Sequence, residues 1–239
     1  MSAAFHVDTH IKRKKLMQAD KTSVAIIDYG MGNLFSVKRA CEEVNLHATI
    51  TSDPEAILKK DAAILPGVGA FGDAMKNIRN LNLIDSIKDF IRSGKAFMGI
   101  CLGMQLLMAE SEEFGIHEGL GVIEGSVIRF SKKLNKEKIM KVPQVGWNTI
   151  HKPKGKSGDI WQNSPLKGIP EDTFMYFVHS YYVSLKNRED ALSNTVYEGI
   201  DYCSSLKVNN IFACQFHPEK SAKNGLKIYR NWAREIKRG

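Results

Sequence analysis

The spacing of hydrophobic positions predicts alternating strands and helices in the first half of the chain. Continuous β-branched and apolar runs are typical of strands that are buried on both faces of a parallel sheet. Apolar residues at helical spacing, bounded by Gly, Pro or Asp, predict helices between them. The predicted strands are residues 22–28, 47–51, 62–65 and 96–101, and the predicted helices are residues 34–44, 73–80 and 83–93. This α/β alternation predicts a central, mostly parallel sheet flanked by helices.

The pattern changes after a helix that we expect to end near Glu110. Short β segments with turns between them predict an antiparallel β region added to the same domain. These segments are residues 119–129, 142–149, 174–184 and 191–197. Residues 152–158 are predicted to be a polar surface loop. We expect a last strand over residues 211–216 and a closing amphipathic helix over residues 222–237.

Composition and cysteine usage restrict the class of protein. The chain has 239 residues, of which 43% are hydrophobic and 25% charged, as expected for one globular domain with a large core. It contains no apolar run of eighteen residues and no apolar signal core, so we expect neither a transmembrane helix nor secretion. Its four cysteines have no close pairing, which predicts reduced thiols in the cytoplasm and no zinc site.

Charge and glycine spacing argue against two classes of ligand. Residues 1–22 are polar and basic without apolar periodicity, so we expect a disordered extension and a single domain over residues 23–239. The net charge is +8, but no basic cluster is interleaved with aromatic residues, so we expect no nucleic-acid partner. The glycine-rich turn at residues 29–33 lacks G-x-G-x-x-G spacing, so no dinucleotide is expected. We predict neither a metal nor any other cofactor.

Residues 96–108 contain the strongest chemical signal. An apolar run ends at Gly99, Cys101 follows, and Gly103 precedes a stretch of helix formers. A strand, a sharp turn and a helix with a nucleophile at the bend form the nucleophile-elbow pattern, here with Cys in place of Ser. Glycines on both sides allow a tight turn, and the helix N-terminus favours a thiolate. The Leu102 N–H is expected to donate to an oxyanion; a small core cysteine at a turn is the alternative.

Two other segments carry residues that fit this cysteine. Residues 66–69 (Pro-Gly-Val-Gly) follow a predicted strand, and their backbone N–H groups can point inward as an oxyanion hole requires; a plain tight turn is the alternative. His217 and Glu219 follow the last predicted strand, and on an extended segment they share one face while Pro218 points away. A carboxylate beside an imidazole fixes its tautomer and stabilises its charged form.

The combination Gly-Ile-Cys-Leu-Gly-Met-Gln with Gln-Phe-His-Pro-Glu resembles the class I (triad) glutamine amidotransferases over nearly all of residues 24–234. Further segments are similar to the glutaminase subunits of imidazole glycerol phosphate synthase, and these are residues 28–33, 65–69, 142–148 and 177–181. The resemblance implies the flavodoxin-like fold of that class. It also implies hydrolysis of L-glutamine through a cysteinyl thioester, with ammonia passed to a (β/α)8-barrel cyclase subunit in a heterodimer of histidine biosynthesis.

The resemblance implies roles for individual residues. The catalytic residues are Cys101 as nucleophile, His217 as proton donor and acceptor, and Glu219, which orients the imidazole. The oxyanion hole comprises Val68, Gly69 and Leu102. The glutamine-binding residues are Gly67, Gln105, His179, Ser180 and Tyr181. The subunit interface and ammonia exit comprise Asn33, Trp147, Asn148, Tyr176 and Lys220.

Other interpretations stay open at this point. A paralogous subunit with the same chemistry could supply ammonia to a surface-sugar (lipopolysaccharide) amidotransferase. A catalytically silent subunit could support its partner only allosterically, and a γ-glutamyl peptidase could use the same fold. For single residues, Trp147 could be a core side chain and Gln105 a surface helix residue.

Overall fold

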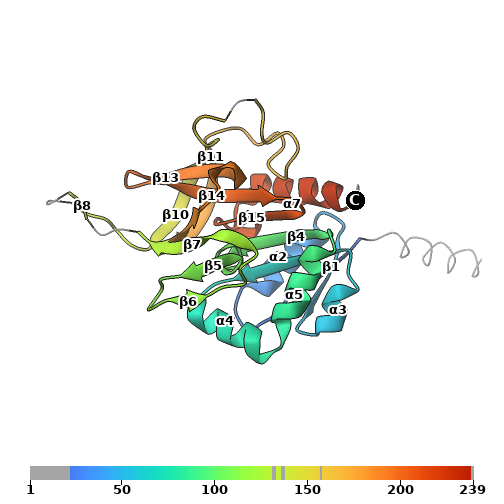
Figure 1. The fold of residues 1–239 in the computed structure, drawn as a ribbon. Coiled ribbons are helices and arrows are strands. Elements are labelled where there is room, and N and C mark those ends of the chain that lie inside the picture. The colour runs from blue at the N-terminus through green and yellow to red at the C-terminus, as the bar shows by residue number, and fades with distance from the viewer. Residues whose placement is uncertain (1–21, 131–132, 136–137, 157, 238–239) are drawn as a thin grey trace, which may run out of the picture.

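The computed structural model describes residues 22–130, 133–135, 138–156 and 158–237 (Figure 1). The predicted basic extension, except its residue 22, lies outside this range. The strands β1 (Ser23–Ile27), β2 (His47–Thr51), β3 (Ala62–Gly67), β4 (Ala96–Cys101) and β15 (Ile211–Cys214) are parallel, in the order β2-β1-β3-β4-β15. This half of the sheet confirms the predicted parallel α/β core.

The same sheet continues beyond β15 with mixed strand directions. β14 (Ile200–Val208) is antiparallel to β15, and β12 (Tyr181–Leu185), β7 (Ile123–Arg129), β5 (Met108–Ser111) and β6 (His117–Glu118) follow in that order. β13 (Ala191–Tyr197) pairs with β14. Two small antiparallel sheets pair β10 (Gln144–Ile150) with β11 (Thr173–His179), and β8 (Lys133–Asn135) with β9 (Lys138–Ile139). The predicted antiparallel region is therefore largely an extension of the central sheet.

Helices cover both faces of the parallel half (Figure 1). α3 (Pro54–Leu58), α4 (Phe71–Asn80) and α5 (Leu83–Arg92) pack on one face, and α2 (Leu34–Glu42) and α7 (Ala222–Ile236) pack on the other. Alternate residues of β1 face the two cores, with Ala25 and Ile27 in one and Val24 and Ile26 in the other. Burial on both faces explains why this strand is continuously apolar.

Two predicted elements end earlier than expected. The helix after Cys101, α6 (Leu102–Leu106), stops at Leu106 instead of near Glu110, because Met108 enters β5 and pairs with β7. The strand predicted to reach residue 216 ends at Cys214, and residues 218–220 form a 3-10 turn, η2 (Pro218–Lys220). The inference that His217 and Glu219 share one face of an extended strand is therefore wrong in its geometry.

The structure also divides one predicted segment and adds another. Residues 174–184 break at Ser180, where the chain leaves β11 and enters β12 in a different sheet. β14 was not predicted, because polar residues such as Ser204 and Ser205 interrupt its apolar pattern although both are fully buried. Ser193 on β13 hydrogen-bonds both of these hydroxyls. Within the described residues, no helix is long and apolar enough to cross a membrane.

Candidate active site

Cys101 lies at the bend between β4 and α6. Its φ of +53° is in the left-handed region, which is uncommon for a residue with a side chain and is typical of strained functional positions. Gly99 and Gly103 do not adopt positive φ, and they serve the bend as predicted, because neither has a side chain that would clash there. A Cβ on Gly103 would lie 1.7 Å from the Leu65 carbonyl oxygen, so this glycine allows α6 to pack directly on β3.

A cavity of about 450 Å³ opens onto the cysteine. Its wall contains Val68 and Gly69 after β3, Cys101 and Leu102 at the bend, and Gln105 in α6. The cavity is also lined by His179, Ser180, Tyr181 and Lys220. The cavity lies at the carboxyl ends of β3 and β4, where open α/β sheets bind their ligands. Cys101 is only 4% exposed, but it is not sealed in hydrocarbon.

Gly67 is the one predicted glutamine-binding residue that does not line the cavity. It is the last residue of β3, and a Cβ there would lie 2.0 Å from the Tyr29 hydroxyl and 3.0 Å from Leu102 Cβ. The Tyr29 hydroxyl donates a hydrogen bond of 2.8 Å to the Pro66 carbonyl. The absence of a side chain at Gly67 is thus required by packing beneath the loop.

His217 and Glu219 lie next to the cysteine without lining the cavity. The Nδ1 of His217 is 2.8 Å from the Glu219 Oε1, and both side chains are almost completely buried. The turn η2 brings them together, because Pro218 begins a 3-10 turn directly after His217. The carboxylate accepts the Nδ1 proton, which leaves Nε2 as the atom able to exchange a proton with a reactant.

The charge of His217 depends on its neighbours. Burial lowers the pKa of His217, but the negative charge of a Cys101 thiolate and the Glu219 carboxylate hydrogen-bonded to Nδ1 together raise this pKa from 6.5 to about 10. Nε2 makes no hydrogen bond of good geometry to any described residue, so its interaction with the sulfur is mainly electrostatic. The arrangement favours the charged imidazolium form of His217 beside the sulfur.

A second buried histidine has the opposite character. Burial lowers the pKa of His179 to about 4, and the charge of His217 adds to this, while the hydrogen bond to the Tyr181 carbonyl opposes it. Nδ1 of His179 is 2.8 Å from that carbonyl oxygen, and Nε2 is 3.1 Å from the Tyr202 hydroxyl. His179 is therefore a neutral side chain that supports the cavity wall at neutral pH.

Gln105 is buried, so the alternative that it is a surface helix residue is wrong. Its Nε2 donates 2.9 Å hydrogen bonds to the Tyr181 carbonyl and to the Gln215 Oε1. The Gln215 Nε2 in turn lies 3.5 Å from the Cys101 sulfur. Sequence reasoning missed Gln215, although it continues the face of β15 on which Ile211 and Ala213 are buried.

Glu113 is a second residue that sequence reasoning missed. It lines the cavity, and its Oε2 accepts a 2.6 Å hydrogen bond from the backbone N–H of Phe71, at the start of α4. This remote carboxylate replaces the missing side-chain cap of that helix. No local sequence pattern could reveal it, because the two residues are 42 positions apart.

Three of the predicted exit residues, Tyr176, Trp147 and Lys220, lie close to one another beside His217. The Tyr176 ring lies 6.4 Å from the His217 ring and 6.0 Å from the Trp147 ring, and Lys220 Nζ lies 5.7 Å from the Tyr176 ring centre. Trp147 is 53% exposed, so its alternative assignment as a core side chain is wrong. The amide of Asn148 is engaged elsewhere, because it donates to the Val196 carbonyl.

Asn33, also predicted at the interface, is the N-cap of α2, and its side chain accepts a hydrogen bond from the Ser36 N–H. Next to it, Phe35 is among the most exposed large apolar side chains of the described chain. Within the same residues, no group of three or more His, Cys, Asp or Glu side chains could hold a metal ion.

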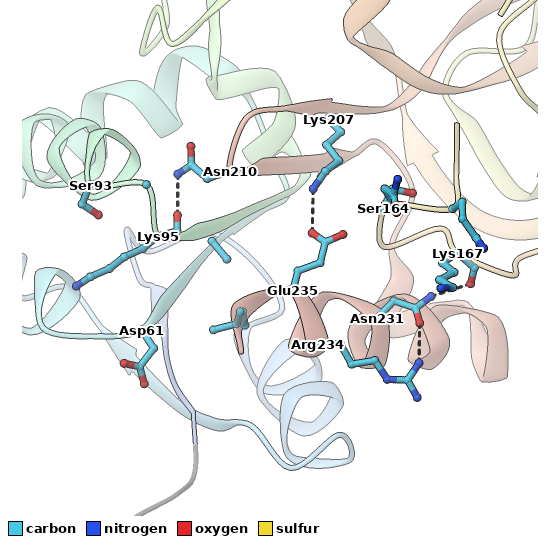
Figure 2. A pocket seen from close by; sticks show the side chains of 15 residues that line it. Asp61, Ser93, Lys95, Ser164, Lys167, Lys207, Asn210, Asn231, Arg234 and Glu235 are labelled. Carbon is cyan, nitrogen blue, oxygen red and sulfur yellow. Dashed lines mark hydrogen bonds and ion pairs between the residues drawn. The ribbon is translucent and has the colours of Figure 1, made fainter. Parts of the chain in front are cut away.

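A second hollow, of about 490 Å³, lies at the amino ends of β3, β4 and β15 (Figure 2), whereas Cys101 is at the carboxyl end of β4. Several of its charged side chains already have partners in the protein. Lys207 pairs with Glu235 at 2.9 Å, and Lys95 donates to the Leu58 carbonyl. Figure 2 shows that the labelled lysines and Arg234 do not point toward a common centre. The hollow contains none of the predicted site residues.

Comparison with known proteins identifies the family. The sequence profile described as glutamine amidotransferase class-I matches residues 25–236. The imidazole glycerol phosphate synthase subunit HisH 1 of Legionella pneumophila (strain Lens) is 44% identical over 207 residues, covering 87% of this chain and 96% of that protein. The HisH subunit of Sulfurimonas denitrificans is 44% identical over 212 residues, covering 88% and 97%. A crystal structure of a glutamine amidotransferase shares the fold, with a TM-score of 0.66, 17% identity, and coverage of 90% of this chain and 98% of that one.

Proposed function

The chain belongs to the class I glutamine amidotransferases and, within them, to the HisH subunits of imidazole glycerol phosphate synthase, and on this basis we propose how its site works. It is a glutaminase subunit, and L-glutamine binds in the cavity at Cys101. The observation that carries the proposal is the buried Glu219–His217 pair beside a cysteine that opens onto this cavity. Such a cysteine is a nucleophile with its own proton donor.

The reaction begins with the thiolate. The sulfur of Cys101 attacks the side-chain carbonyl carbon of glutamine, and the carbonyl electron pair moves onto oxygen. The backbone N–H of Leu102 and an N–H of the Val68–Gly69 peptide stabilise this oxyanion. His217 gives its Nε2 proton to the amide nitrogen, the C–N bond breaks, and ammonia leaves. A glutamyl thioester remains on the sulfur.

Water completes the cycle. The neutral His217 accepts a proton from a water molecule as its oxygen attacks the thioester carbon, and the C–S bond breaks to give glutamate and the thiolate. Glu219 stabilises the imidazolium at both stages, because its carboxylate stays hydrogen-bonded to Nδ1. The atoms balance as glutamine plus water yielding glutamate plus ammonia.

The polar groups that line the cavity suit an amino-acid substrate. Both N–H groups of the Gln105 amide are used by protein acceptors, so Oε1 is the atom left to interact with a ligand, and it can only accept. Glu113 adds a carboxylate to the same cavity. Two acceptors suit the α-ammonium group of glutamine, and the backbone at Ser180 and Tyr181 is proposed to hold its carboxylate.

We further propose a (β/α)8-barrel cyclase subunit as partner in a heterodimer. Free ammonia would become ammonium in water, which is not a nucleophile, so a shielded exit is required. The Tyr176 and Trp147 rings are proposed to border this exit, with Asn33, Asn148 and Lys220 at the interface. Exposed apolar residues there, including Phe35 and Trp147, support a protein partner. Action in the cytoplasm stays a prediction.

Glutamate production with each candidate synthase tests the proposal. We expect the cyclase to raise glutamine turnover and Cys101→Ser to abolish it. Labelling of Cys101 by a glutamine-analogue electrophile separates an active site from a silent one. Stimulation only by a surface-sugar amidotransferase would refute the histidine-pathway partner, and peptide cleavage without a partner would indicate a γ-glutamyl peptidase.

A further inference from the structure

Two buried glutamine side chains link the Tyr181 carbonyl to the Cys101 sulfur. This carbonyl fixes which atom of each amide is the donor. The Tyr181 backbone oxygen can only accept, so the Gln105 atom 2.9 Å from it must be the amide nitrogen. The second N–H of that nitrogen points to Gln215, which must present its oxygen, also at 2.9 Å. The Gln215 nitrogen is then the atom that lies 3.5 Å from the sulfur. Neither amide can be turned over without placing two donors or two acceptors together.

Burial keeps this chain of amides in place. Gln215 is fully buried and Gln105 is 5% exposed, so the hydrogen bond between the two amides is shielded from bulk water. The backbone of Gln215 is also fixed, because its N–H donates to the Ser204 carbonyl. A buried polar side chain held at both ends keeps one orientation. The donor at the sulfur is therefore preorganised before any substrate binds.

Among the described titratable groups that interact with the sulfur, only His217 can stabilise a negative charge on it. Cys101 interacts electrostatically with Tyr29, Tyr202, Cys214 and His217. Burial raises the pKa of Tyr29, Tyr202 and Cys214, so these three groups are neutral at neutral pH. Within this set, positive charge comes from His217 alone, and Gln215 adds a neutral N–H from another direction.

We propose that the side-chain amide of Gln215 stabilises the Cys101 thiolate by donating its Nε2–H to the sulfur, and that Gln105 holds Gln215 in the orientation that makes this possible. Gln215 thus acts on the nucleophile itself, whereas Gln105 is a positioning residue for it. The effect of Gln215 on glutamine turnover rests on the proposed function. Formation of the thiolate, however, can be measured by alkylation without glutamine. Sulfur accepts hydrogen bonds more strongly as a thiolate than as a thiol.

The test is the pH dependence of Cys101 alkylation by iodoacetamide in the full chain, with the modified peptide identified by mass spectrometry. Gln215→Met keeps the length of the side chain but removes the donor. A hydrogen bond to a charged group is worth enough to move the midpoint of the alkylation rate upward by about one pH unit. At pH values below the midpoint, the rate should therefore fall about ten-fold.

Two further variants make the inference specific. Gln215→Glu still accepts from Gln105 but presents a carboxylate oxygen to the sulfur, so the midpoint should rise further than in Gln215→Met. Gln105→Met frees Gln215 to rotate and should give a smaller rise. Gln144→Met is the matched control, because this buried glutamine bonds to the Tyr202 hydroxyl and not to the sulfur; its midpoint should equal that of the wild type.

An unchanged midpoint in Gln215→Met would overturn the inference. A merely structural role would lower glutamine turnover equally at every pH and leave the alkylation midpoint in place. If Gln215→Met does not fold, Gln105→Met decides alone, and a wild-type midpoint there overturns the inference. Absence of glutamine turnover in the wild-type complex would refute the proposed function while leaving the alkylation result valid.

Discussion

Replacing Glu219 by Gln tests the link between the carboxylate and the imidazole with almost no change in shape. In the wild type, Oε1 accepts the His217 Nδ1 proton at 2.8 Å, whereas Oε2 is buried and has no partner among the described residues. An amide group can place its NH2 at either position. At the Oε2 position both of its donors would be buried and unpaired, so we expect the NH2 to turn toward Nδ1.

The magnitude follows from this orientation. Loss of the negative charge alone weakens the stabilisation of the imidazolium by about 1–1.5 kcal/mol, the difference between charged and neutral hydrogen bonds. The NH2 at Nδ1 also forces that atom to accept, which moves the ring proton to Nε2 in the neutral state. An inverted tautomer of this kind lowers kcat by about 10⁴ in the Ser-His-Asp triad. We expect kcat to fall by about 10³ to 10⁴ in Glu219→Gln.

The assay is steady-state glutamate production by the complex with its synthase partner. Because His217 and Glu219 do not line the cavity, KM should stay within about three-fold of the wild-type value while kcat falls. Glu235→Gln removes the same charge from the Lys207–Glu235 ion pair, which lines the second hollow and not the cavity at Cys101, and should leave kcat unchanged. A kcat of Glu219→Gln within about ten-fold of the wild type would refute the reasoning.

Further predictions concern packing and pH. Gly103→Ala places a Cβ 1.7 Å from the Leu65 carbonyl oxygen, so urea denaturation should show a loss of about 1–3 kcal/mol or more; wild-type stability would contradict the packing argument. Tyr29→Phe leaves the buried Pro66 carbonyl without its 2.8 Å donor and should cost about 1–3 kcal/mol in the same assay; wild-type stability would contradict the importance of this bond. The folded-state pKa of His179 is lowered from 6.5 to about 4, so the unfolded chain binds more protons between these values and stability should fall as pH decreases from 6.5 to 4. His179→Gln should show a shallower fall over that range, and equal slopes would show that His179 does not contribute.

The bend at Cys101 illustrates both the reach and the limit of local sequence patterns. Apolar run, glycine, cysteine and helix formers are enough to predict strand, turn and nucleophile, because each depends on short-range sterics and propensity. The role of Gly103 is different. Its missing side chain matters because the Leu65 carbonyl, on another strand, lies where a Cβ would be, and such a distance exists only after the sheet has formed.

The His217–Glu219 contact was predicted for a reason that the fold does not use. Alternation along an extended strand gave the correct pair, but a 3-10 turn beginning at Pro218 brings the two side chains together. Strand ends are hard to predict because pairing with a neighbouring strand, rather than local propensity, decides where they stop. The same reason explains α6, which ends at Leu106 because Met108 pairs with β7.

The sequence alone determined the alternating α/β core, the cysteine at its bend and the histidine–glutamate pair, since periodicity and short motifs are local properties of the chain. Only the tertiary structure decided that Gln215 donates to the sulfur and that Glu113 caps a helix 42 positions away. Both contacts join segments distant in sequence, and their partners are ordinary polar residues without a local pattern. Hydrogen-bond direction and cavity shape arise only when these segments pack together.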